Sequence, residues 1–188
     1  FTARFLARRC ARYGESRPPI DVLQYGEERK VGPFSFSFAA VSHSIPGAAS
    51  LILKTPDGVI VHSGDFRVDD DPVFGAPTDL DSLAAAAGDD GVLCLLADST
   101  GAPIPGRNGG EKAVGVLLDQ CFHDVDGPVQ GVVFVSLFAS HLQRLALLIE
   151  SCRKHERKLV LLGRGLLEAL QMGLAEGVLD GSGVIVEE

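Results

Sequence analysis

The pattern of apolar and polar residues predicts a strand-rich first part of the chain. Residues 34–38 alternate phenylalanine with serine, which is the period of a strand that buries one face. The apolar runs 49–55 and 59–63 are joined by the turn residues Pro56, Asp57 and Gly58, so they predict an antiparallel hairpin. A further apolar run, 91–97, predicts a buried strand. We therefore expect a sheet built largely from neighbouring segments.

Helical periods surround and follow these strands. We expect a helix over residues 2–13 that ends at Gly14, and a helix over 84–87 opened by a sequence, 78–81, that resembles a capping box. The Gly- and Pro-rich stretch 101–110 then separates this part from one in which helices and strands alternate. The elements expected there are a helix at 111–122, a strand at 132–135, a helix at 141–155 capped by Ser140, a strand at 158–162, a helix at 166–175 and a strand at 184–186. This βαβ order predicts a parallel sheet with right-handed crossovers.

Composition narrows the class of protein. The chain has 188 residues, of which 46% are hydrophobic and 22% charged, and this balance excludes a disordered chain. It has no run of about 18 apolar residues, and nothing near Phe1 resembles a cleavable signal, so we expect a cytoplasmic protein without a membrane partner. Because the first residue is not Met, we also expect an internal piece of a longer chain. The four cysteines form no CxxC pair, which argues against a Cys-ligated zinc.

The net charge of −8 is concentrated in the middle of the chain. Residues 57–126 carry fourteen acidic and three basic side chains, which argues against a nucleic-acid surface there unless the carboxylates hold cations. Residues 1–17 instead carry five arginines and one acidic side chain. This basic helix either touches phosphates or presents a solvated face, and both interpretations remain open.

Three polar clusters stand where predicted strands end, at residues 43–47, 64–65 and 98–100. His43 and Asp65 could converge at one sheet edge, where a neutral imidazole and a carboxylate suit Zn²⁺ or Mn²⁺; the alternative is a hydrogen-bonded loop histidine and a turn aspartate. Ser99 either caps a turn or binds phosphate. His141, near a helix N-terminus, either meets a phosphate or is an ordinary helix residue.

Four motifs carry a resemblance to a known family. They are Val41-Ser42-His43-Ser44-Ile45-Pro46, His62-Ser63-Gly64-Asp65-Phe66, Leu96-Ala97-Asp98-Ser99-Thr100 and Phe138-Ala139-Ser140. Their order and spacing resemble those of the ribonuclease J family, in the β-CASP branch of the metallo-β-lactamase superfamily. The resemblance implies an α/β fold in which residues 1–105 form part of a metallo-β-lactamase αββα domain. Residues 106–188 would be the first βαβ units of a β-CASP domain.

The resemblance also implies a function. It implies metal-dependent hydrolysis of RNA phosphodiesters, both 5′-exonucleolytic and endonucleolytic, at a two-metal Zn²⁺ site, with Mn²⁺ or Mg²⁺ as alternatives. RNA would be the partner, and the whole protein would form a homo-oligomer, a dimer or a tetramer. Two alternatives stay open: another hydrolase of the same fold that acts on DNA or a small ester, and a non-catalytic β-CASP module that binds RNA or a protein partner.

The resemblance assigns roles to individual residues. It implies that His43 is a ligand of one metal, that Asp65 is the catalytic carboxylate bridging two, and that Asp98 is the acidic residue of the first β-CASP motif. Tentative RNA or phosphate contacts are Ser99 and His141. The family's HxHxDH motif is absent from the sequence and is expected upstream, and later histidines are expected beyond Glu188, so this chain alone is expected to be inactive. Gly47, His141 and Gly165 depart from the family pattern, which puts RNA contacts in doubt.

Overall fold

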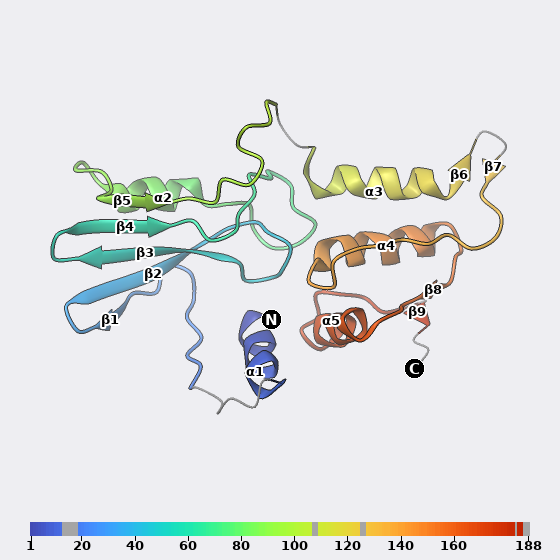
Figure 1. Cartoon of the computed structure of the whole chain (residues 1–188), viewed down its shortest axis with the longest axis horizontal. Coiled ribbons are helices and arrows are strands. Elements are labelled where there is room, and N and C mark those ends of the chain that lie inside the picture. Colours follow the sequence, from blue (N-terminus) through green and yellow to red (C-terminus); the bar gives the residue numbers. More distant parts are fainter. Residues whose placement is uncertain (13–18, 107–108, 125–126, 183, 186–188) are drawn as a thin grey trace.

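The computed structural model describes residues 1–12, 19–106, 109–124, 127–182 and 184–185, which form a mixed α/β structure (Figure 1). Its helices are α1 (Thr2–Arg12), α2 (Leu80–Ala87), α3 (Gly110–Cys121), α4 (Leu142–Lys154) and α5 (Arg164–Ala175). Its strands are β1 (Arg29–Val31), β2 (Phe34–Ala40), β3 (Ala49–Thr55), β4 (Gly58–His62), β5 (Cys94–Leu96), β6 (His123–Asp124), β7 (Gly127–Pro128), β8 (Leu159–Val160) and β9 (Val184–Ile185). None of the helices in these ranges is long and apolar enough to cross a membrane.

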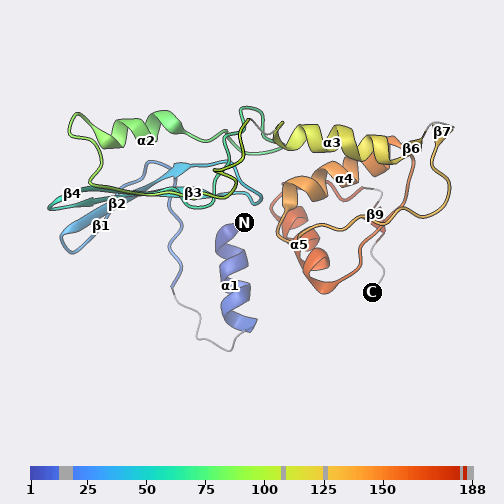
Figure 2. The ribbon, with the colours of Figure 1, turned by 45° about the horizontal axis from the view of Figure 1, so that its top comes forward.

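The first five strands form one sheet in the order β1-β2-β3-β4-β5. The first four are antiparallel neighbours, and β5 pairs with β4 in parallel. The predicted hairpin is confirmed: Ile52 lies opposite Val61, both are buried, and Thr55 faces Gly58 across the turn. Figure 2 shows α2 over one face of this sheet. Because β2, β4 and β5 run in the same direction, their carboxyl ends meet at one edge, where the loops that follow them come together.

The strand predicted over 91–97 exists, but only Cys94–Leu96 pair with a neighbouring strand, and these three residues are exposed. β5 is an edge strand of the sheet, joined to β4 on one side. An unbroken apolar run is compatible with a central strand or an edge strand, and nothing in the run itself distinguishes them. The prediction of a buried strand is therefore wrong for the described residues.

α4 and α5 share an apolar core, and α1 stands beside α5 (Figure 1). The buried members of this core are Leu142, Leu145, Ile149, Leu161, Leu170 and Leu179. Phe1 from the chain start and Ile45 from the loop after β2 pack against it. The core therefore also receives side chains from the first part, so the loop that carries His43 rests on the second part of the chain.

The predicted parallel sheet of the second part is reduced to one pair of short strands. β8 and β9 pair in parallel and α5 connects them, so one βαβ unit is present. The strand expected at 132–135 is wrong: these residues form no strand, and Val132 and Phe134 are 79% and 85% exposed. β-branched residues favour a strand only where a neighbouring strand accepts their backbone hydrogen bonds, and among the described residues none does so here.

Two helix starts also differ from the expectation. α4 begins after His141, whose Nδ1 accepts a hydrogen bond from the backbone N–H of Arg144 at 3.4 Å, so His141 and not Ser140 is the N-cap. α2 begins four residues earlier than expected, because Asp79 accepts a hydrogen bond from the backbone N–H of Ser82 at 2.9 Å. Both helices are capped by a side chain that can accept a hydrogen bond, which satisfies one of the free N–H groups of the first turn.

Candidate active site at the carboxyl edge of the sheet

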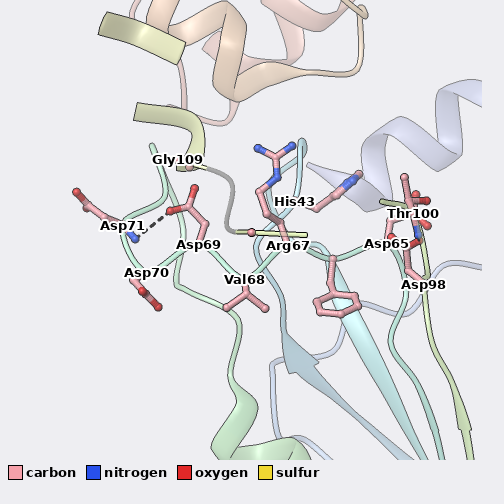
Figure 3. A pocket seen from close by; sticks show the side chains of 13 residues that line it. His43, Asp65, Arg67, Val68, Asp69, Asp70, Asp71, Asp98, Thr100 and Gly109 are labelled. Atoms are coloured by element: carbon pink, nitrogen blue, oxygen red, sulfur yellow. Dashed lines mark hydrogen bonds between the residues drawn. The ribbon is translucent and has the colours of Figure 1, made fainter. Parts of the chain in front are cut away.

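His43, Asp65 and Asp98 line one open pocket of about 850 Å³ at the carboxyl edge of the sheet. They come from the three loops that follow β2, β4 and β5. Figure 3 shows His43, Asp65 and Asp98 to one side of Arg67, with the acidic run 69–71 on the other side. The convergence that the sequence predicted for His43 and Asp65 is thus observed as a shared pocket.

His43 is half-buried and is held through both its ring and its backbone. The Ser44 Oγ lies 3.1 Å from its Nδ1, and the Gln143 side-chain amide donates a hydrogen bond of 2.6 Å to its carbonyl oxygen. Burial lowers the pKa of His43, although the negative charges of Asp65 and Asp98 oppose that shift. The imidazole is therefore neutral at pH 7, which is the form that binds metal ions.

Asp65 is placed by a backbone turn that only glycine can make. Gly64 has a φ of +64°, and a Cβ atom there would lie 2.7 Å from the carbonyl oxygen of Ala49. A side chain at this position would therefore both strain the backbone and clash with β3. The turn follows β4 directly and leaves the Asp65 side chain exposed to the pocket.

Asp98 is fixed beside this turn by hydrogen bonds. Its backbone N–H donates to the Ser63 Oγ at 2.9 Å, and its carboxylate accepts from the backbone N–H of Thr100, also at 2.9 Å. The hydrogen bonds from Thr100, with a weaker one from the Phe66 backbone, lower the pKa of Asp98. A carboxylate held by backbone amides of two loops is suited to orient its neighbours.

The two residues expected to touch phosphate lie outside the pocket lining. Ser99 is exposed, directly after Asp98. His141 is buried at the start of α4, with its Nε2 3.5 Å from the Glu111 Oε1. No observation of the structure tests a phosphate contact at either residue, so both stay predictions.

His141 gives the stability of the fold a pH dependence. Burial, with Arg144 and Arg67 nearby, lowers its pKa from 6.5 to about 4. As the pH falls from 6.5 to 4, the unfolded chain takes up a proton that the folded chain does not, so stability falls by at most about 3 kcal/mol. His141→Asn, which keeps a capping side chain, should flatten this fall.

Urea unfolding at pH 7, 5.5 and 4.5 measures the effect in the wild-type chain and the variant. His43 contributes in the same direction in both proteins, because its pKa is also lowered, so the difference between the two curves isolates His141. Equal slopes for the two proteins would show that His141 takes up its proton as readily in the folded chain as in the unfolded chain, so that its pKa is not lowered by folding.

Sequence reasoning missed Glu111, which is 2% exposed and lies at the centre of a charged cluster beside the pocket. Its carboxylate pairs with Arg67 from the Asp65 loop and accepts hydrogen bonds from Arg144 of α4, the closer one 3.2 Å from Nε to Oε2. A glutamate in the first turn of a helix is common because it suits the helix dipole, so the sequence contains no signal of this role.

The described residues of the pocket include side chains of the types that bind metal ions, but too few of them to complete a site. A neutral histidine and a carboxylate are ligands that Zn²⁺ and Mn²⁺ accept. Among the residues that the structure describes, however, no three His, Cys, Asp or Glu side chains are grouped closely enough to hold a metal ion. A catalytic zinc site takes three protein ligands, so the described residues do not complete one.

Known proteins are similar in sequence to this chain. A family model described as the β-CASP domain of ribonuclease J matches residues 130–187. Ribonuclease J of Corynebacterium glutamicum is 35% identical over 95% of this chain, and that of Thermus thermophilus is 37% identical over 86%. This sequence belongs to the ribonuclease J family. The expected β-CASP assignment is thus confirmed for residues 130–187, while the division near residue 105 stays a prediction. The chain spans 24% and 26% of the lengths of those two ribonucleases J.

A solved structure shows the same fold at low sequence identity. The crystal structure of a protein of unknown function from Enterococcus faecalis V583 aligns with 91% of this chain and 42% of its own, with a TM-score of 0.58 and 19% identity. At this identity the likeness concerns the fold alone. Ribonuclease J 1 of Streptococcus pyogenes, in contrast, is 39% identical over 82% of this chain.

Proposed function

We propose that the protein is a metal-dependent ribonuclease in which this chain supplies part of the active site. The supporting observation is that His43, Asp65 and Asp98 share one pocket. In this proposal His43 would be a ligand of one metal ion, Asp65 would be shared by two, and Asp98 would orient groups beside them. The reaction is hydrolysis of RNA phosphodiesters, from the 5′ end and internally.

We propose that this chain is part of a longer protein. Residues 1–105 would belong to a metallo-β-lactamase domain whose other histidines complete the site with His43 and Asp65. The bound cations, Zn²⁺ or else Mn²⁺ or Mg²⁺, would supply an activated water and stabilise charge on the phosphate. We further propose that this protein acts in the cytoplasm as a homo-oligomer, a dimer or a tetramer.

This chain's own residues would prepare the site for the cations. The lowered pKa of His43 keeps its ring neutral, and Ser44 engages Nδ1, so Nε2 is the atom through which the ring would bind a metal. The acidic run 69–71 lines the same pocket. Without cations these carboxylates would repel an RNA phosphate, so substrate binding should depend on the metal.

The experiment is hydrolysis of 5′-monophosphorylated RNA by the full-length protein that carries this chain, with Zn²⁺ or Mn²⁺ added. Single-stranded DNA of the same sequence and a small ester are the competing substrates. We expect RNA cleavage that a chelator abolishes and that added metal restores. Cleavage of DNA or ester with intact RNA would favour another hydrolase of this fold, and RNA binding without cleavage would favour a non-catalytic module.

A further inference from the structure

The first residues of α4 hold the backbone of the loop that carries His43. Gln143 of α4 donates its side-chain amide to the carbonyl oxygen of His43 at 2.6 Å, and the backbone N–H of Leu142 donates to the next carbonyl, that of Ser44, at 3.0 Å. The partners in both contacts are 98 or more residues apart in sequence. The start of α4 therefore fixes the backbone of the His43 loop.

The start of α3 holds the Asp65 loop through the side chains of that loop. Glu111 pairs with Arg67, two residues after Asp65. Further along the same loop, the Asp69 carboxylate accepts a hydrogen bond from the backbone N–H of Glu111 at 3.0 Å. Arg144 links the same glutamate to α4. One buried carboxylate thus joins the Asp65 loop, α3 and α4.

The chemistry of Gln143 indicates that it holds the His43 loop in position. The residue is 2% exposed, and its Oε1 has no hydrogen-bond partner among the described residues. A buried carbonyl oxygen without a partner is unfavourable, whereas a methionine would fill similar space without a polar atom to satisfy. What the amide adds at this position is its hydrogen bond to His43.

We propose that Gln143 and Glu111 are positioning residues through which α4 and α3 hold the His43 and Asp65 loops in one geometry. The inference rests on the proposed function insofar as it treats His43 and Asp65 as metal ligands. Groups that orient metal ligands typically change metal affinity or activity by about 10- to 100-fold when they are replaced. The helices of the β-CASP part would then act on the pocket without contacting the reacting atoms.

Gln143→Met is the main test, and Glu111→Gln is the second variant. In the 188-residue chain, NMR signals of the His43 ring should broaden or split in Gln143→Met, and the Asp65 and Phe66 amide signals should do so in Glu111→Gln. In the full-length protein each variant should lower kcat for RNA about 10- to 100-fold and leave KM within about threefold.

The matched control is Asp119→Asn. Asp119 of α3 contacts Ser151 and Lys154 in the last turn of α4 and the following residue, His155. It therefore also joins the two helices, away from the pocket loops. This control should leave the His43 and Asp65 signals and kcat unchanged. Equal changes in Asp119→Asn and Gln143→Met, or unchanged loop signals in both test variants, would overturn the proposal.

The NMR readout separates this proposal from the proposed function. If the full-length protein cleaves no RNA while the loop signals change as expected, the ribonuclease function fails and the positioning of the loops stands. If RNA is cleaved and neither test variant changes kcat or the loop signals, the positioning role fails and the ribonuclease function stands.

Discussion

Asp65→Ala should lower metal-dependent RNA hydrolysis by the full-length protein about 1,000-fold or more. The variant removes the carboxylate that we propose bridges two cations, and a two-metal site needs both to stabilise the attacking and leaving oxygens. In other enzymes, loss of a single hydrogen-bond donor to an oxyanion already lowers kcat about 100- to 1,000-fold. Because Asp65 is exposed, the free energy of unfolding should change by less than about 0.5 kcal/mol.

Initial rates on 5′-monophosphorylated RNA, with bound metal measured in the same samples, test this expectation. Asp57→Ala is the control, since it removes the same charge from the exposed turn at the opposite end of β4. We expect the control to retain both its rate and its metal. Wild-type rates in Asp65→Ala would show that the bridging assignment is wrong.

Leu142→Ala should lower the free energy of unfolding by about 4 kcal/mol. Its side chain is 0% exposed in the core that α4 and α5 share, and truncation would leave a cavity. Gly173 of α5 packs closely against this side chain, since a Cβ there would lie 2.9 Å from the Leu142 Cδ2. The loss of stability should therefore exceed the free energy of transferring the deleted atoms from the core to water, because a cavity remains.

Urea unfolding followed by circular dichroism measures this loss. Leu162→Ala is the control, because Leu162 is 72% exposed, and it should change the free energy of unfolding by less than about 0.5 kcal/mol. Equal effects of the two substitutions would mean that Leu142 is not part of a packed core in solution.

Local sequence patterns predicted the parts of the fold that depend on neighbours in the chain. The hairpin of β3 and β4 follows from two apolar runs and the turn at 56–58. The exposed edge position of β5 and the absence of a strand at 132–135 depend on which segments lie alongside. That information belongs to the tertiary structure, and propensity does not contain it.

The candidate site likewise has residues that the sequence could predict and residues that only the structure shows. The approach of His43 and Asp65 could be predicted, because each follows a predicted strand and strand ends can meet at one edge of a sheet. The role expected of Asp98 came from the family resemblance. Glu111 and Gln143 act across the interface between the two parts of the chain, where they meet Arg67 and the His43 backbone. Their sequence surroundings are those of ordinary amphipathic helices, so only the packed structure shows their contacts.

The lack of space for a side chain at Gly64 affects how the results of a mutational scan of this protein should be interpreted. In a saturation scan scored by growth or turnover, every replacement at Gly64 should be depleted as strongly as replacements at the aspartate that follows it, since a Cβ there meets the Ala49 carbonyl. A glycine carries no reactive group, so such depletion would report a steric limit of β3. Libraries meant to alter substrate choice should therefore keep Gly64 fixed and vary the exposed loop residues around it.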